Sequence, residues 1–271
     1  MNRYTHIVPY SAATTNKLAL DHLKRYPWRW MLSPFRPNEK VCLEYGEGHA
    51  IDNGAFVYGK NHLEFNPDPF MKDVDKYGET ADFVVIPDVL YDAQATLDQA
   101  EKWIERLDGL RLMIVAQDGM TEEDLSAFCA RDIGVFIGGT TEFKLNSIGW
   151  ISKMCDRFNV LCHVGRVNTL KRIEICVAQG AHSFDGSGPA IFCNTARLLT
   201  DRLIRYESDM FPRDLSKLLV KYFAQDCKQG LQDHAKLRRK QKSIVELYEE
   251  IVFPHLSVDD YLHITKWRNN G

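Results

Sequence analysis

The stretch LMIVAQDGMTEEDLSAFCARDIGVFIGG, residues 112–139, holds one complete strand–helix–strand unit. Its apolar run Leu112–Gln117 has the length and composition of a buried strand. Thr121 then provides a capping residue at the start of a run with helical periodicity, and a second apolar run follows at Gly134–Gly139. Two strands that are joined through a helix pair in parallel, so this unit predicts a parallel α/β fold.

The same alternation of a short apolar run, a turn and an amphipathic helix recurs along most of the chain. The eight expected strands are His6–Tyr10, Trp30–Ser33, Ala50–Asn53, Phe83–Asp88, Leu112–Gln117, Gly134–Gly139, Val160–Gly165 and Ala181–Asp185. Apolar residues at helical spacing follow four of them, at Leu18, Leu20 and Leu23, at Ala95, Leu97, Ala100, Ile104 and Leu107, at Leu125, Phe128 and Cys129, and at Ile173, Val177 and Ala178. The last of these helices is expected to start at Asn168-Thr-Leu-Lys and to end at Gly180.

Eight parallel strands are the number that closes a (β/α)8 barrel of the TIM type, for which about 250 residues is a typical length. A doubly wound open sheet is the competing topology. It usually carries a Gly-rich phosphate loop after its first strand, where this chain has Val8-Pro-Tyr-Ser-Ala-Ala. The sequence therefore favours the barrel.

The alternation stops after about Thr195. Four segments beyond this point have helical patterns with no strand pattern between them, namely Ala196–Tyr206, Leu215–Phe223, Ser243–Val252 and Val258–Trp267. The sequence thus predicts a barrel over residues 1–194 and a C-terminal helical segment over residues 195–271 that packs on the barrel.

The composition is that of a folded globular chain, with 45% apolar, 26% charged and 11% aromatic residues in 271. No apolar run approaches the roughly 18 residues of a membrane span, and the N-terminus lacks the pattern of a secretory signal, so a cytoplasmic location is expected. The net charge of −3 means that any role on a polynucleotide requires a local basic patch. The seven cysteines form no C-x-x-C or C-x-C pair, which predicts free thiols.

Polar residues gather where the expected strands end, and these ends carry the active site in a (β/α)8 barrel. An aspartate after one strand is often the N-cap of the next helix, so a single polar end is weak evidence. Six of the eight ends, however, carry a carboxylate, an amide, a double glycine or an arginine. They are Asp52-Asn-Gly, Pro87-Asp88, Gln117-Asp118, Gly138-Gly139, His163-Val-Gly-Arg166 and Asp185-Gly186.

The chemistry of these residues fits a flat heterocycle. Carboxylate and glutamine side chains pair with ring N–H groups, and exposed glycine N–H groups hold a carbonyl oxygen. Phe56 lies at a spacing from Asp52 that places its ring over such a ligand, although a core position is the ordinary alternative for a phenylalanine.

The strand-end motifs, in their order along the chain, resemble those of the tRNA-guanine transglycosylase superfamily. The matching stretches are Asp52-Asn-Gly-Ala-Phe56, Val85-Ile-Pro-Asp88, Ile114-Val-Ala-Gln117, Phe136-Ile-Gly-Gly139, His163-Val-Gly-Arg166 and Ala181-His-Ser-Phe-Asp185-Gly. They are most similar to the DNA-modifying branch, the 7-deazaguanine DNA transglycosylases of bacteria and phages. The resemblance implies an enzyme that exchanges guanine in DNA for a 7-deazaguanine (preQ0-like) base.

The resemblance also implies a role for each matched residue. Asp185 matches the nucleophile, which forms a covalent glycosyl-enzyme, and Asp52 matches the general acid and base. Asp88 and Gln117 match the pair that recognises the base. Further substrate contacts are implied for the backbone of Gly138 and Gly139, for Phe56 by stacking and for Cys162 in the wall of the pocket.

The chain departs from the tRNA enzymes at their zinc site. Those enzymes carry Cys-x-Cys-x-x-Cys and a histidine just after the nucleophile, whereas here Cys193 stands alone, with Cys227 and His234 nearest to it. Two distant ligands do not complete a four-coordinate site, so we predict no zinc and no other cofactor. Because the zinc subdomain helps to seat tRNA, its absence favours DNA as the substrate.

The expected partners are DNA and a free 7-deazaguanine base, with room for helper proteins and no membrane. The target guanine nucleotide must be flipped out of a duplex or offered single-stranded. Arg166, at a strand end beside the proposed nucleophile, is expected to contact a phosphate or a sugar, and a basic run near the C-terminus is expected to contact phosphates. That run comprises Lys236, Arg238, Arg239 and Lys240, and a solvated helix face is its equally weighted alternative.

Three alternatives stay open at this point. The first is the same base exchange on tRNA, and the second is a non-catalytic paralogue that binds nucleic acid. Retention of both Asp52 and Asp185 argues against the second. The third is an unrelated barrel lyase or aldolase, which would need a strand-end lysine for a Schiff base, and the eight expected strand ends carry none.

Overall fold

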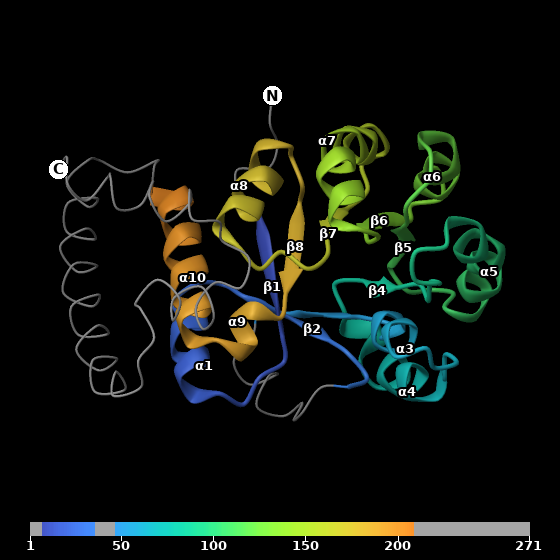
Figure 1. Ribbon diagram of the computed structural model, residues 1–271. Coiled ribbons are helices and arrows are strands. Elements are labelled where there is room, and N and C mark those ends of the chain that lie inside the picture. Colours follow the sequence, from blue (N-terminus) through green and yellow to red (C-terminus); the bar gives the residue numbers. More distant parts are fainter. Residues whose placement is uncertain (1–6, 36–46, 209–271) are drawn as a thin grey trace, which may run out of the picture. The chain divides into compact units, whose positions relative to one another are not determined.

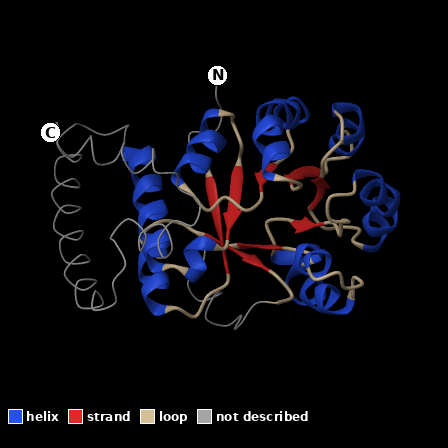
Figure 2. Cartoon of the chain, in the orientation of Figure 1, coloured by secondary structure: helices blue, strands red, loops and turns tan. Residues whose placement is uncertain are grey.

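The eight expected strands pair in chain order into a closed parallel barrel (Figures 1 and 2). The computed structural model describes residues 7–35 and 47–208. The strands are β1 (Val8–Ala12), β2 (Arg29–Leu32), β3 (His49–Ile51), β4 (Val84–Val85), β5 (Leu112–Ala116), β6 (Gly134–Ile137), β7 (Cys162–Val164) and β8 (Ser183–Gly186). The predicted (β/α)8 barrel is confirmed.

The barrel closes between its first and last strands. β1 pairs with β8 from Val8, which lies opposite Ser183, to Ser11, which lies opposite Gly186. The carboxyl ends of all eight strands therefore meet at one end of the barrel, which is where the polar strand ends were expected to converge.

Helices lie around the outside of the barrel and follow each strand from β3 to β7 as well as β1, whereas part of the segment between β2 and β3 lies outside the described residues. They are α1 (Lys17–Leu23), α3 (Ala55–Lys60), α4 (Asp68–Tyr77) with the 3-10 turn η1 (Gly78–Thr80), α5 (Ala93–Arg106), α6 (Glu122–Cys129), α7 (Thr141–Phe158) and α8 (Leu170–Ala178). Thr121 caps α6 as expected, in a capping box with Asp124. At α8 the cap is Thr169 and not Asn168. The Asn168 side chain instead accepts a hydrogen bond from the Gly188 N–H at 2.7 Å, and this bond ties the loop after β7 to the segment after β8.

Alternate residues of the strands fill the barrel interior. This core contains Tyr10, Met31, Ala50, Phe83, Val85, Met113 and Val115, with Val8, Phe136 and Leu161 packed against it. Side chains alternate along a strand, so a residue two positions further on faces the same way. Asp52 therefore follows the inward-facing Ala50, and Gln117 follows the inward-facing Val115, both at the carboxyl end of the barrel.

β4 is much shorter than the expected strand Phe83–Asp88. The Ile86 N–H still donates to the Met113 carbonyl at 2.9 Å, but Pro87 has no N–H with which to continue the ladder. Asp88 consequently lies in the loop beyond the strand, where strand alternation does not fix the direction of its side chain.

Two helices follow β8, α9 (Gly188–Ile191) and α10 (Cys193–Ser208). The second confirms the helix expected at Ala196–Tyr206. The chain divides into two compact units, residues 1–200 and 201–271. The remaining expected helices, Leu215–Phe223, Ser243–Val252 and Val258–Trp267, lie outside the described residues. Within the described part of the chain, no helix combines the length and apolar character that crossing a membrane requires.

Candidate active site

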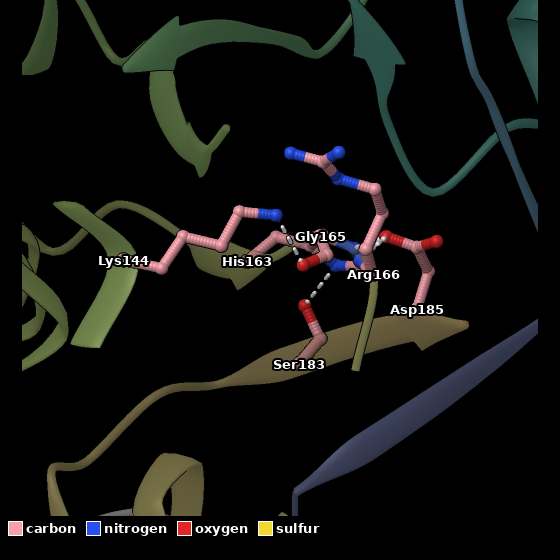
Figure 3. Close-up of polar contacts among 6 residues, drawn as sticks. All are labelled: Lys144, His163, Gly165, Arg166, Ser183 and Asp185. Atoms are coloured by element: carbon pink, nitrogen blue, oxygen red, sulfur yellow. Dashed lines mark hydrogen bonds and ion pairs between the residues drawn. The ribbon is translucent and has the colours of Figure 1, made fainter. Parts of the chain in front are cut away.

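Asp185, near the end of β8, is held by two donors from the end of β7 (Figure 3). Its Oδ1 accepts a hydrogen bond from the Arg166 backbone N–H at 3.3 Å and lies 3.2 Å from His163 Nε2. The other imidazole nitrogen, Nδ1, lies 2.8 Å from the Ser183 hydroxyl. These contacts hold one carboxylate oxygen in place, and the side chain stays partly open to solvent.

His163 is fully buried, and its ring stacks on Phe136 with centroids 4.8 Å apart. Burial lowers the pKa of this imidazole, against the opposing effect of Asp185. A neutral ring with its proton on Nε2 donates to Asp185 and accepts from Ser183. His163 therefore orients the carboxylate without neutralising its charge.

Asp52, which follows β3, lies close enough to Asp185 for the two charges to interact. Burial, and after it the negative charges of Asp185 and Asp88, raise the pKa of Asp52 to about 7. Hydrogen bonds from the Gly54 backbone and the Ser33 hydroxyl oppose this shift. One end of the barrel thus brings together an anchored carboxylate and a carboxyl group that holds a proton near neutral pH.

Asp88 and Gln117 form the centre of a second group at the same end. The Gln117 amide donates to Asp88 Oδ2 at 2.5 Å, and its oxygen accepts from the Tyr91 N–H at 3.2 Å. Asn53 donates to Asp88 Oδ1 at 2.8 Å and to the Ile86 carbonyl at 2.8 Å. Both oxygens of Asp88 therefore have a donor, and burial raises the pKa of this carboxyl group.

Asn53 is a site residue that sequence reasoning missed. Its Oδ1 accepts a hydrogen bond from the Ala55 N–H at 2.7 Å, which fixes the orientation of the amide and aims its nitrogen at Asp88. In the sequence Asp-Asn-Gly this residue has the appearance of an ordinary turn asparagine, so its type and position gave no signal of the contact.

Arg166 lies over Phe56 at the mouth of the barrel. The guanidinium carbon is 4.5 Å from the ring centroid, and the same group donates to the Gly139 carbonyl. Its backbone has the left-handed φ of 61°, which is uncommon outside glycine. The sequence predicts a phosphate or sugar contact for Arg166 and stacking on the base for Phe56, and in the structure the two side chains contact each other.

The two glycines after β6 differ in what they offer a ligand. The Gly138 N–H donates to the Ala116 carbonyl at 3.0 Å. The prediction that both glycine N–H groups are free to hold a ligand oxygen is therefore wrong for Gly138. Gly139 has φ of +68°, and a Cβ atom there would lie 2.4 Å from an oxygen of Asp118. Both positions need glycine for steric reasons, whatever ligand they contact.

Gly138→Ala is expected to lower the free energy of unfolding by about 1–3 kcal/mol. The added Cβ would lie 2.6 Å from Val115 Cγ1 and 3.1 Å from the Ala116 carbonyl oxygen. Urea denaturation measures the change, and Val115→Ala in the same chain should restore part of it by removing the first contact. A Gly138→Ala protein as stable as the parent would contradict this steric role.

Cys162 does not line the site, and its predicted place in the pocket wall is wrong. Its thiol lies 3.4 Å from the Ser152 hydroxyl of α7, on the helical side of β7, and the residue is fully buried. The physical reason is strand alternation, because the next residue, His163, faces the barrel axis and Cys162 must therefore face outward. The residue at this end of β7 that reaches Asp185 is His163.

The remaining predicted residues lie outside the described part of the chain. They are Lys236, Arg238, Arg239 and Lys240 of the basic run, and Cys227 and His234. Across residues 7–35 and 47–208, no group of three or more histidine, cysteine or acidic side chains is arranged to hold a metal ion.

Comparison with known proteins shows the fold alone. No protein-family model matches the chain, and no curated protein does. Solved structures do match, among them a putative fructose-1,6-biphosphate aldolase from Coccidioides immitis. The alignment has a TM-score of 0.51 at 10% sequence identity and covers 74% of this chain and 91% of that one. The chain is therefore similar to this structure in fold.

Proposed function

We propose that the protein is a DNA-guanine transglycosylase, which replaces guanine in DNA by a 7-deazaguanine base through a covalent intermediate on Asp185. The observation that carries this proposal is the pairing of two unlike carboxyl groups. Asp185 is anchored by two donors, and Asp52 beside it has a pKa raised to about 7. Two carboxyl groups whose environments separate their protonation are typical of glycosyl transfer with an acid and a nucleophile.

In the first step, an oxygen of Asp185 attacks C1′ of the target deoxyguanosine, and the bond from C1′ to N9 breaks. The electron pair of that bond goes to the base, and the Asp52 carboxyl group supplies the proton that makes guanine a neutral leaving group. The negative charge at Asp185 also stabilises the oxocarbenium character of the transition state.

In the second step, the 7-deazaguanine base loses its N9 proton to the Asp52 carboxylate and attacks C1′. The ester bond to Asp185 breaks and the carboxylate is regenerated, so two inversions give retention at C1′. Exchange instead of hydrolysis requires that the ester be shielded from water until the new base arrives.

Asp88 and Gln117 are the groups we assign to the base. Beyond the bond that joins them, the Asp88 oxygens keep lone pairs and the Gln117 amide keeps a second N–H, and recognition of guanine N–H and carbonyl groups requires such acceptors and donors. Phe56 supplies the stacking face once Arg166 moves off it. The released guanidinium is then available to a DNA phosphate.

Gln117→Leu is expected to raise the KM for the free base by about 10- to 100-fold with a smaller change in kcat. The substitution removes a donor to Asp88 and leaves the Tyr91 N–H without its acceptor. Steady-state exchange kinetics measure the effect. Gln94→Leu, on the exposed face of α5, is the matched control, and an equal change in both variants would contradict the assignment.

Exchange of labelled guanine tests the choice of polymer. The protein is incubated with radiolabelled guanine and either guanine-containing DNA, duplex and single-stranded, or unmodified tRNA. The proposal predicts label in DNA and none in tRNA. Label in tRNA alone would support the alternative tRNA enzyme, and label in neither would support the non-catalytic alternative. A Schiff-base aldolase is disfavoured because the strands and strand ends of the described barrel carry no lysine.

A further inference from the structure

Lys144, in the first turns of α7, is buried on the outer side of the loop that follows β7. It is 7% exposed, and its Nζ donates a hydrogen bond to the Gly165 carbonyl at 2.7 Å. The small cavity beside it is lined by Leu145, Ile148, Val164 and Arg172 among others. Burying an ammonium group in such surroundings is costly unless it is paired, and this lysine has a backbone carbonyl as its acceptor.

The carbonyl that Lys144 binds belongs to the peptide group whose N–H contacts the proposed nucleophile. The Gly165 C=O and the Arg166 N–H are the two ends of one planar amide. The first accepts from Lys144, and the second donates to Asp185 Oδ1 at 3.3 Å. Figure 3 shows Lys144 and Asp185 on opposite sides of this backbone. Hydrogen bonds in such a chain polarise one another, so a cation at the oxygen strengthens the N–H donor.

We propose that Lys144 is a positioning residue for Asp185, acting through the Gly165–Arg166 peptide group. It holds the peptide in the orientation that aims the Arg166 N–H at the carboxylate, and its charge strengthens that donor. The left-handed backbone of Arg166 needs such a restraint, since a non-glycine residue at φ of 61° is not held there by its own preference. The role of Lys144 in base exchange rests on the proposed function. Its effect on the Arg166 N–H through the peptide group, which we call the relay, does not.

The charge of Lys144 depends on pH in the physiological range. Burial, and after it the charges of Arg166 and Arg172, lower its pKa to about 7 against the opposing effects of Asp185 and Cys176. His163 also faces this group from β7. Below pH 7 the ammonium form makes a charge-assisted bond to the carbonyl, and above it the neutral amine makes a weaker one.

The relay is tested by NMR of the full-length protein labelled with 15N-arginine. The Arg166 amide resonance, identified by its loss in Arg166→Lys, is followed from pH 5.5 to 8.5. We expect this resonance to titrate in the parent with a larger change in chemical shift than in Lys144→Met, which removes the donor at nearly constant length and leaves the contribution of Asp52, whose pKa is also about 7. Lys144→Gln, a neutral donor, should give an intermediate position and the same reduced titration. Lys153→Met, an exposed lysine of the same helix, is the matched control.

Exchange kinetics on the same variants test the consequence for catalysis. Lys144→Met is expected to lower kcat by about 10- to 100-fold, the size of one hydrogen bond to a charged group, with the KM for DNA unchanged. An Arg166 resonance that titrates identically in the parent and in Lys144→Met would overturn the relay. A reduced titration with an unchanged kcat would overturn the positioning role. Absence of base exchange by the parent would contradict the proposed function. The NMR result would still show whether Lys144 acts on the Arg166 N–H through the peptide group.

Discussion

Asp185→Asn is expected to abolish base exchange, lowering its rate by at least about 10³-fold. Asparagine keeps an oxygen that accepts from His163 and from the Arg166 N–H, so the local geometry is preserved. An amide does not supply the negative oxygen that attacks C1′. Incorporation of labelled guanine into DNA measures the loss, and the expected outcome is no signal above the protein-free reaction.

Two controls separate loss of the nucleophile from loss of the fold. Asp98→Asn, on the exposed side of α5, changes the same functional group away from the site and should exchange at the parental rate. Equal urea midpoints for Asp185→Asn and the parent would show that the fold is intact. An Asp185→Asn protein that retains more than a few per cent of the parental rate would remove this residue from the mechanism.

Asp52→Asn is expected to lower the exchange rate by about 10²- to 10⁴-fold, the usual contribution of a general acid or base. The pKa of Asp52 is raised to about 7, so the parental rate should fall as pH rises through this value and the acid is lost. A DNA that contains N7-methylguanine provides a sharp test. Its cationic base leaves without an added proton, and a pocket for a 7-substituted base has room for the methyl group. Asp52→Asn should therefore form the glycosyl-enzyme from this DNA at close to the parental rate, and an equally large defect on both DNAs would contradict the acid role.

Stability provides a second readout for Asp52 that needs no substrate. Its pKa is higher in the folded chain than the ordinary aspartate value of 3.8, so ionisation favours the unfolded state, and stability falls as pH rises from about 4 to about 7. Asp52→Asn removes this ionisation. At pH 8 it should raise the free energy of unfolding by on the order of 2 kcal/mol. This gain is part of the roughly 4 kcal/mol to which a shift of three pKa units corresponds. At pH 4 the gain should disappear. Urea denaturation at the two pH values measures this difference.

The sequence predicted the positions of the strands and the residues at the strand ends. Short apolar runs placed all eight strands, and the barrel rule then placed Asp52, Gln117 and Asp185 at one end. The alternation of side chains along β7 could also have been used to predict which of its residues faces the barrel axis. If Asp185 and its partners face the axis, then at the end of β7 either Cys162 or His163 does so, and the family resemblance led to the wrong one of the two.

Contacts across loops could not be predicted in the same way. Asn53 reaches Asp88, and Lys144 reaches the Gly165 carbonyl, between segments that are not adjacent in sequence. Neither contact follows from periodicity, because it depends on how the loops fold over the barrel mouth. Lys144 in particular lies on α7, a helix that the sequence patterns did not single out.

The most direct test of the account is to find where the DNA becomes attached. The protein is incubated with a guanine-containing oligonucleotide without free base, quenched in denaturant and digested, and the modified peptide is sequenced by mass spectrometry. We expect a deoxyribose-linked oligonucleotide that has lost guanine, in ester linkage to Asp185, and more of it at pH 6 than at pH 8. An adduct on another residue, or release of guanine with no adduct at any pH in that range, would contradict covalent base exchange at this carboxylate.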